Sequence, residues 1–331
     1  MAYLSSLMNP DQTAMNKLLL VLISLFFVSG ISAQSVKDSE TGNITQAHSF
    51  GKMKLSYLSD NIYNGRKDSL PVPYITPSAA WHHKSGLYAR TSASFLVSNY
   101  AQRLDLFNIE GGYEYEIGDH FNGSISANKP FYNSASVSVR SETKAEFNAD
   151  FTWDIKSLFT LNGGVGYMLT SGPADVYFNS GLSHEFTFGE DDQWSIEPSF
   201  NANFGTRYYY DQYKQKRLVK TGKKKRVADS SVIVNGNEKI VTTTTVTTVN
   251  PQKLVLLDNE WAVSFYYYTG SWSFYAIPTV TIPLNPAEYV TTVKTRTTFS
   301  NGSSTHNIRQ TNSSETITNH FFIEIGIGLR L

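Results

Sequence analysis

From about residue 50 onward, hydrophobic and polar residues alternate along the chain. The clearest example covers residues 145–155, where alanine, phenylalanine, tryptophan and isoleucine alternate with acidic and other polar residues. A period of two places the two sets on opposite faces of a β-strand. The pattern therefore predicts a strand with one apolar face and one acidic face.

The same alternation recurs in other segments, so that about twelve strands are expected in all. The others span residues 53–57, 74–83, 87–97, 107–117, 121–127, 159–169, 178–188, 194–204, 261–267, 272–282 and 321–331. Many have roughly the ten residues that a tilted membrane-crossing strand needs, and such barrels usually have an even strand number. The predicted fold is all-β: a single antiparallel up-and-down transmembrane barrel over residues 50–331.

The connections between these strands alternate between short and long. Short ones lie at residues 83–86, 118–120, 156–157, 189–192 and 269–271, and long ones at 59–72, 129–143, 211–254 and 285–317. The connections at 98–102 and 170–174 are brief. Membrane barrels have short turns at the periplasmic rim and longer loops outside, whereas a soluble β-sandwich has no reason for this asymmetry.

The two longest connections each contain an Asn-Gly pair, which is typical of a β-hairpin turn. Residues 231–234 and 239–249 flank Asn235-Gly236, and residues 289–299 precede Asn301-Gly302. The Thr/Val-rich segments 242–248 and 290–295 extend strands that the tight turn at 269–271 makes neighbours. We therefore expect a small extracellular sheet beside the rim.

Tryptophan placement supports a membrane barrel. Trp81, Trp153, Trp194 and Trp272 lie near predicted short turns, and Trp261 lies farther along its strand. Amphipathic aromatic rings gather where lipid meets water, so these positions indicate an inner and an outer aromatic girdle.

The first 33 residues have the pattern of a secretory signal peptide, with a basic start, an apolar core at 18–28 and a cut expected after Ala33. Residues 1–14 precede this pattern, so Met15 is a candidate start, and residues 34–49 are expected to be a periplasmic segment. The chain has no cysteine, 28 basic and 28 acidic residues and a mean hydropathy of −0.27. This balance argues against nucleic-acid binding and against a bundle of membrane helices.

Residues 321–331 alternate apolar and other residues to the last position. This segment resembles the C-terminal strand of Gram-negative outer-membrane β-barrel proteins, although that family usually ends on an aromatic residue and this chain ends on Leu331. The resemblance implies an outer-membrane location, contact with lipid and lipopolysaccharide, and recognition of this strand by the barrel-insertion machinery.

If the apolar face meets lipid, the opposite face lines the lumen and carries many charges. The candidate lumen charges are Lys52, Lys54, Arg90, Glu110, Glu114, Asp150, Asp154 and Arg330. Barrel closure would make Lys52, Lys54 and Arg330 a basic wall opposite acidic strands, a field that a selective pore uses. Alternatively, such residues pair across a filled lumen, as Arg90 could with Glu114.

The leading functional hypothesis is a narrow channel for small polar solutes or cations, because acidic residues outnumber basic ones on the whole predicted lumen face. Besides the candidates above, that face holds Arg207 and the acidic residues Glu116, Glu146, Glu185, Glu197, Asp258, Glu260 and Glu324. The alternative is a surface-exposed binding or assembly protein that uses the barrel as an anchor. A third possibility, a soluble exported β protein, would need the apolar face inside. The longest loop carries a basic run that suits an anionic surface or is simply solvated. Its members are Lys214, Lys216, Arg217, Lys220, Lys223, Lys224, Lys225 and Arg226.

No catalytic, cofactor or metal site is expected. Of the histidines in the predicted loops and turns, only His306 lies in an outer loop, beside Ser303 and Ser304 but with no obvious carboxylate to orient it. His82 and His83 are neighbours on a strand and so face opposite ways. The sequence has no glycine-rich phosphate loop and no metal-ligand spacing.

Overall fold

A computed structural model describes residues 48–67, 70–155, 158–209, 230–234 and 238–331. The signal-peptide prediction and the basic run at 214–226 lie outside these residues. The strands that form the barrel are β1 (Phe50–Leu58), β2 (Tyr74–His82), β3 (Leu87–Ser98), β4 (Ala101–Ile117), β5 (Phe121–Tyr132), β6 (Ala145–Ile155), β7 (Phe159–Leu169), β8 (Asp175–Ser183), β9 (Phe186–Phe188), β10 (Trp194–Gly205), β13 (Val255–Thr269), β14 (Trp272–Pro283) and β17 (His320–Arg330).

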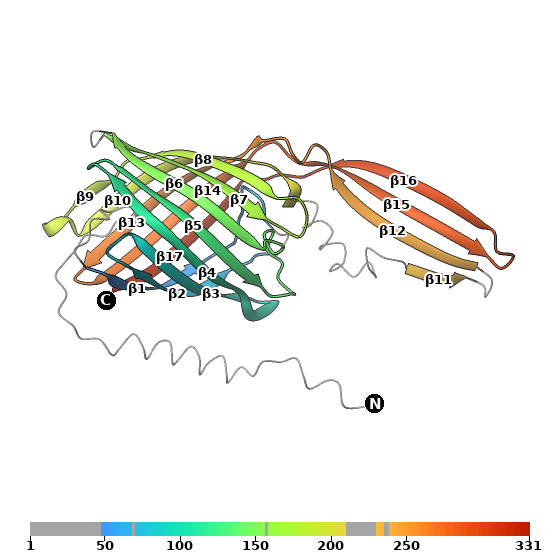
Figure 1. Ribbon diagram of the computed structural model, residues 1–331, viewed down its shortest axis with the longest axis horizontal. Helices are drawn as coiled ribbons and strands as arrows, with labels where there is room; N and C mark the ends of the chain where they lie inside the picture. Colours follow the sequence, from blue (N-terminus) through green and yellow to red (C-terminus); the bar gives the residue numbers. More distant parts are fainter. Residues whose placement is uncertain (1–47, 68–69, 156–157, 210–229, 235–237) are drawn as a thin grey trace, which may run out of the picture.

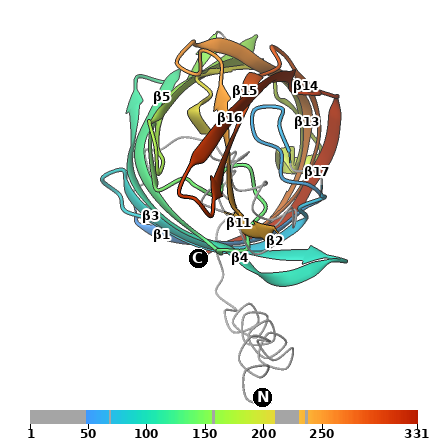
Figure 2. The same cartoon turned by 90° about the vertical axis from the view of Figure 1, so that its right-hand side faces the viewer.

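These strands close into a single antiparallel barrel (Figures 1 and 2). Each pairs with its neighbours in chain order, β10 pairs with β13, and β17 pairs with β1 to close the ring. The short β8 and β9 both pair with β10 and occupy one position, so the ring has twelve strands. The predicted fold class and strand number are therefore confirmed.

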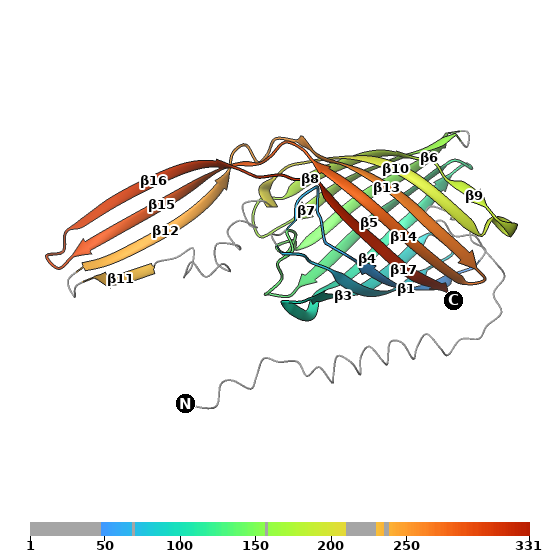
Figure 3. The ribbon, with the colours of Figure 1, turned by 180° about the vertical axis from the view of Figure 1, so that it is seen from behind.

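The remaining strands form a separate sheet that projects beyond one end of the barrel (Figures 1 and 3). It has four strands in the order β11 (Ser230–Val234), β12 (Glu238–Thr248), β15 (Glu288–Phe299) and β16 (Ser304–Ser314). β12 and β15 pair along their length, from Glu238 opposite Phe299 to Thr248 opposite Tyr289. The predicted pairing of the two Thr/Val-rich segments is confirmed.

The two ends of the barrel differ. The short-turn end holds the turns at 83–86, 118–120, 189–193 and 269–271, together with the start of β1 and the end of β17. A short 3-10 helix, η1 (Glu190–Asp192), lies within one of these turns. The loop end holds the longer segments 59–73 and 133–144, the short connection 284–287 and the root of the projecting sheet.

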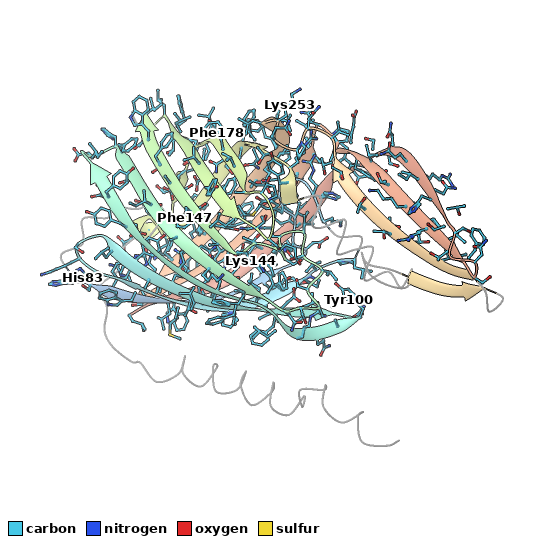
Figure 4. The ribbon with its side chains drawn as sticks, turned by 45° about the vertical axis from the view of Figure 1, so that its right-hand side comes forward. His83, Tyr100, Lys144, Phe147, Phe178 and Lys253 are labelled. Atoms are coloured by element: carbon cyan, nitrogen blue, oxygen red, sulfur yellow. The ribbon has the colours of Figure 1, made fainter. Side chains whose placement is uncertain are left out.

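Apolar side chains cover the outside of the barrel wall. Ile125 and Val165 are each 53% exposed, and Phe147 and Phe178 are also exposed on the outer wall (Figure 4). Trp81, Trp153, Trp194 and Trp261 are exposed as well. Soluble proteins rarely expose so much contiguous apolar surface, so this belt is of the kind that a lipid bilayer covers.

Several strand bounds differ from the prediction. β4 begins at Ala101 rather than 107, because β3 and β4 continue to pair up to a tight turn in which Ser98 lies opposite Ala101. β5 continues to Tyr132, so the predicted long connection begins at residue 133. The predicted strand 178–188 is interrupted between β8 and β9. The extra residues of β4 and β5 are strand residues because they pair with the neighbouring strands. Local alternation of apolar and polar residues does not reveal such pairing.

Among the described residues, no helix is long and apolar enough to cross a membrane.

Candidate functional site in the barrel lumen

The lumen contains a cavity of about 580 Å³ at the short-turn end. Its lining comes from seven neighbouring strands of the ring: β13, β14, β17, β1, β2, β3 and β4. Of the predicted lumen charges, the cavity brings together Lys52, Lys54, Arg90, Glu114 and Arg330. The described lining therefore has four basic side chains and one acidic side chain, besides His82.

Aromatic rings form a stack on one side of this cavity. The rings of Phe50 and His82 lie 4.7 Å apart and nearly parallel, and His82 stacks on Tyr88 at 5.7 Å. The guanidinium group of Arg330 lies over the Phe50 ring at 4.2 Å, and that of Arg90 lies over Tyr88 at 5.8 Å. This aromatic stack of Phe50, His82 and Tyr88 therefore carries a cation at each end.

Tyrosines from β13 and β14 form the other side. The rings of Tyr266 and Tyr268 stack at 5.9 Å, and Tyr275 lies 6.1 Å from Tyr266. Lys54 extends over the Tyr275 ring at 4.4 Å and forms an ion pair with Glu324 at 3.5 Å. The cavity thus combines positive charge with ring faces.

The alternative of a filled lumen allowed Arg90 to pair with Glu114, but the structure gives each residue a different partner. Arg90 lies directly opposite Glu110 in the β3–β4 ladder, and the two charged groups are 3.8 Å apart. Glu114 instead contacts His82, with 3.2 Å between Nδ1 of the histidine and Oε2 of the glutamate. Side chains directly opposite each other on neighbouring strands are the closest, and the register of the β3–β4 ladder places Glu110 opposite Arg90.

Asp150 and Asp154 lie on β6, and the structure does not place them in the cavity lining. Asp150 is exposed and has Ser124 of β5 and Gly164 of β7 as its cross-strand partners. Asp154 lies 3.9 Å from His120 at the short-turn end. Arg90 is also accessible, with 47% of its side chain exposed. Water therefore reaches charged side chains on the inner face of the wall.

The loop end has a different character, because part of the β1–β2 connection folds inward. Tyr63 and Arg66 exchange two backbone hydrogen bonds of 2.8 and 2.9 Å around Asn64-Gly65, whose φ angles are 48° and 70°. Positive φ at both central residues is typical of a two-residue type I′ hairpin turn. We call residues 59–66 the inner hairpin.

Arg66 fixes the inner hairpin to the rim. Its side chain is only 3% exposed and donates hydrogen bonds to the carbonyl oxygens of Leu257 at 2.6 Å, Leu284 at 2.8 Å and Asn285 at 3.1 Å. It also pairs with the Glu315 carboxylate at 3.3 Å. Glu315 directly follows β16, so the inner hairpin is bonded to the root of the projecting sheet.

The Tyr63 side chain extends from the inner hairpin to the opposite wall of the barrel. Its hydroxyl group lies 4.0 Å from the Met168 sulfur on β7, the strand opposite β1 in the ring of twelve. Its ring meets Tyr209 edge-on at 5.5 Å and lies under the Arg140 guanidinium group at 4.8 Å. Burial raises the pKa of the Tyr63 phenol well above its usual range, so this group stays neutral. The hairpin therefore spans the loop end from wall to wall.

The β5–β6 connection contacts the inner hairpin. Ser138 accepts a hydrogen bond from the Asn61 side chain at 3.1 Å, and Arg140 pairs with Glu146. Nearby, the fully buried Asp105 accepts hydrogen bonds from Tyr74 and Ser136, both at 2.6 Å. A bonded polar network therefore crosses the loop end, whereas the cavity lies at the short-turn end.

Sequence reasoning missed the inner hairpin and its anchor Arg66. The Asn64-Gly65 pair was an available signal for the turn, since this dipeptide favours a type I′ hairpin. The partners of Arg66 are mostly backbone carbonyl groups more than 190 residues away, which no local pattern indicates.

The residues considered for catalysis lie at or next to the start of β16 in the projecting sheet. His306 lies on the exposed β16, and among the described residues it forms no ion pair with a carboxylate. The described residues contain no group of three or more histidine or acidic side chains that could hold a metal ion.

No protein-family model and no curated protein sequence matches the chain. Several solved structures are similar to it in fold. A porin has a TM-score of 0.29 and 8% identity, covering 86% of this chain and 99% of that one. The outer-membrane channel DcaP of Acinetobacter baumannii has a TM-score of 0.27 and 8% identity, covering 91% and 100%. OccAB4 of the same organism has a TM-score of 0.28 and 9% identity, covering 87% and 99%. This likeness to Gram-negative outer-membrane β-barrels is one of general architecture.

Proposed function

We propose that the protein is a narrow outer-membrane channel for small polar solutes, and that the inner hairpin closes its loop end. The observation that carries this proposal is the solvent contact of charged lumen side chains such as Arg90 and Asp150, inside a closed wall whose outer surface is apolar. A barrel that serves only as an anchor does not need a wet, charged interior.

Membrane orientation follows from the same features. The apolar belt lies in the bilayer, the short-turn end faces the periplasm and the loop end faces outward. The cavity then opens toward the periplasm, and the inner hairpin separates the lumen from the outside.

Conductance of purified protein in planar bilayers tests this function. We expect small or brief openings from the wild-type protein, because the network around Arg66 holds the loop end closed. We expect frequent openings from Arg66→Met, which removes the bonds to Leu257, Leu284 and Glu315. Absence of conductance from both proteins would contradict the channel.

The projecting sheet favours a second candidate, a surface-exposed binding or assembly protein. The sheet extends well beyond the barrel, and its outer strand β16 is exposed along almost its entire length (Figure 1). Such an edge can receive a strand from a partner. If deletion of residues 214–250 abolishes attachment of cells to a surface while neither wild-type nor Arg66→Met protein conducts, the anchor function replaces the channel.

A further inference from the structure

A buried carboxyl group lies at the loop end of the barrel without a hydrogen-bond donor. Asp258 on β13 is completely buried, and within the described chain no donor of normal geometry reaches either of its two carboxylate oxygens. Burying an ionised carboxylate is very costly unless a cation, a metal ion or a proton compensates the charge. Asp258 therefore needs a compensating positive charge.

Arg66 faces Asp258 but does not supply this charge. A guanidinium group has five N–H donors, and those of Arg66 are all used for other partners. They bond the Glu315 carboxylate and the carbonyl oxygens of Asn64, Leu257, Leu284 and Asn285. The charge of Arg66 is thus already balanced by Glu315, and no donor remains for Asp258.

Three other oxygen-bearing side chains gather around Asp258 on the lumen face. Asn203 of β10 lies directly opposite Asp258, and Glu260 follows it two residues later on the same face of β13. Thr281 of β14 lies directly opposite Glu260. Thr281 is also completely buried, and its hydroxyl group forms no hydrogen bond of normal geometry with the described residues. The four side chains thus lie close together without satisfying Asp258 or Thr281.

These side chains suit a hard divalent cation. They offer two carboxylates, one amide oxygen and one hydroxyl oxygen, and Ca²⁺ takes roughly six to eight oxygen ligands in a flexible geometry. A third acid is not required, because amide oxygens, backbone carbonyl groups and water also bind Ca²⁺. Two carboxylates balance its charge. Mg²⁺ loses its water reluctantly, so the complete burial of Asp258 and Thr281 favours Ca²⁺.

The inner hairpin covers this group of side chains. A Cβ atom at Gly65 would lie 3.0 Å from the Cβ atom of Asp258 and 2.7 Å from that of Pro283, the partner of Asp258 in the β13–β14 ladder. Gly65 therefore packs directly on the wall that carries Asp258. Glu260 keeps partial exposure, which leaves an entry path from the lumen.

We propose that one Ca²⁺ ion binds under the inner hairpin between four side chains, those of Asn203, Asp258, Glu260 and Thr281. The ion removes the repulsion between the two carboxylates and stabilises the wall on which Gly65 packs. It therefore favours the closed position of the inner hairpin. The binding site does not depend on the channel, whereas its effect on opening rests on the proposed function.

Titration calorimetry tests the site on the purified full chain in detergent, stripped with EGTA and exchanged into chelator-free buffer. CaCl₂ should bind at one ion per chain, with a dissociation constant of about 10⁻³ M or tighter, as in extracellular calcium sites. Asp258→Asn and Glu260→Gln each remove one charged ligand, so each should weaken binding about tenfold or more. MgCl₂ should bind about tenfold more weakly than CaCl₂.

Asp154→Asn is the matched control, because it removes a carboxylate at the short-turn end, where Asp154 lies 3.9 Å from His120. It should leave the Ca²⁺ affinity unchanged. Thermal unfolding shows whether the variants fold. Without Ca²⁺, Asp258→Asn should be at least as stable as the wild-type protein, because it removes an uncompensated charge. Ca²⁺ should raise the unfolding midpoint of the wild-type and control proteins but not that of Asp258→Asn.

Absence of saturable Ca²⁺ binding by the wild-type protein would overturn the proposal, as would binding that survives Asp258→Asn or that Asp154→Asn weakens equally. A proton shared by Asp258 and Glu260 is the competing explanation. It predicts no Ca²⁺ binding and a wild-type protein that becomes more stable as the pH is lowered.

Conductance separates this site from the channel. If the protein conducts, chelation of Ca²⁺ should raise its open probability, and Asp258→Asn should not respond. A conducting protein that does not respond to chelation would contradict the effect on closure. Ca²⁺ binding by a protein that never conducts would contradict the channel and leave the binding site in place.

Discussion

Arg66 and Glu315 form an ion pair of 3.3 Å although 249 residues separate them in the chain. The pair joins the inner hairpin to the segment that directly follows the projecting sheet. Glu315 also accepts a hydrogen bond from the Ala287 backbone at 3.0 Å, on the connection that leads from β14 to β15. The inner hairpin is therefore bonded, through Arg66 and Glu315, to two of the connections between the barrel and the projecting sheet.

Breaking this pair should favour the open channel. Arg66→Met leaves the mostly buried Glu315 carboxylate without its cation, which costs about 3 to 5 kcal/mol for a buried pair. We expect a marked rise in open probability in single-channel recordings. Lys67→Met is the matched control, since Lys67 pairs with Asp60 within the same segment and is more exposed. An equal rise in both variants would contradict the role of Arg66.

The facing of β5 predicts opposite outcomes for arginine at neighbouring positions. Ile125→Arg places a charge on the apolar outer wall, which costs about 2 to 4 kcal/mol at mid-bilayer and should block assembly. Ser124→Arg places it on the lumen face between Glu114 and Asp150 and should assemble normally. Heat-modifiable gel migration of outer-membrane extracts measures both. Equal accumulation of the two variants would show that the facing is wrong.

Two adjacent glycines of β4 should differ in their tolerance of a methyl group. A Cβ atom at Gly112 would lie 2.6 Å from the Tyr88 ring and would also collide with the Ile125 carbonyl group. At Gly111 the nearest atom would be 3.7 Å away. Overpacking of this kind costs about 1 to 3 kcal/mol, so Gly112→Ala should lower the urea midpoint of unfolding. Gly111→Ala should not, and similar midpoints would contradict the packing.

Ion selectivity tests the charge of the lumen. The excess of acidic residues over the whole predicted lumen face favours cations. We therefore expect the reversal potential in a salt gradient to indicate cation preference. Glu114→Gln with Asp150→Asn should weaken this preference, because it removes two of the acidic groups. Anion preference in the wild-type protein would contradict this account of the lumen charge.

Much of the architecture could be predicted from the sequence. Alternation identified the strands, and the Asn301-Gly302 turn with its Thr/Val-rich flank identified the β15–β16 hairpin, because these signals are local. The partner of Arg90 was not predictable in the same way, since a shift of register exchanges Glu110 for Glu114. Arg66 was missed because its partners are distant backbone groups. Local patterns determine which face a residue occupies, and tertiary contacts determine what it meets there.

The most direct test of the account is to lock the inner hairpin in place and record conductance. Asn61 and Ser138 are hydrogen-bonded across the loop end at 3.1 Å, and the chain has no native cysteine to interfere. Asn61→Cys with Ser138→Cys, joined by a short bifunctional methanethiosulfonate reagent, should abolish conductance, and dithiothreitol should restore it. Each single-cysteine variant should conduct throughout. Conductance that persists when the two cysteines are cross-linked would contradict closure of the channel by the inner hairpin.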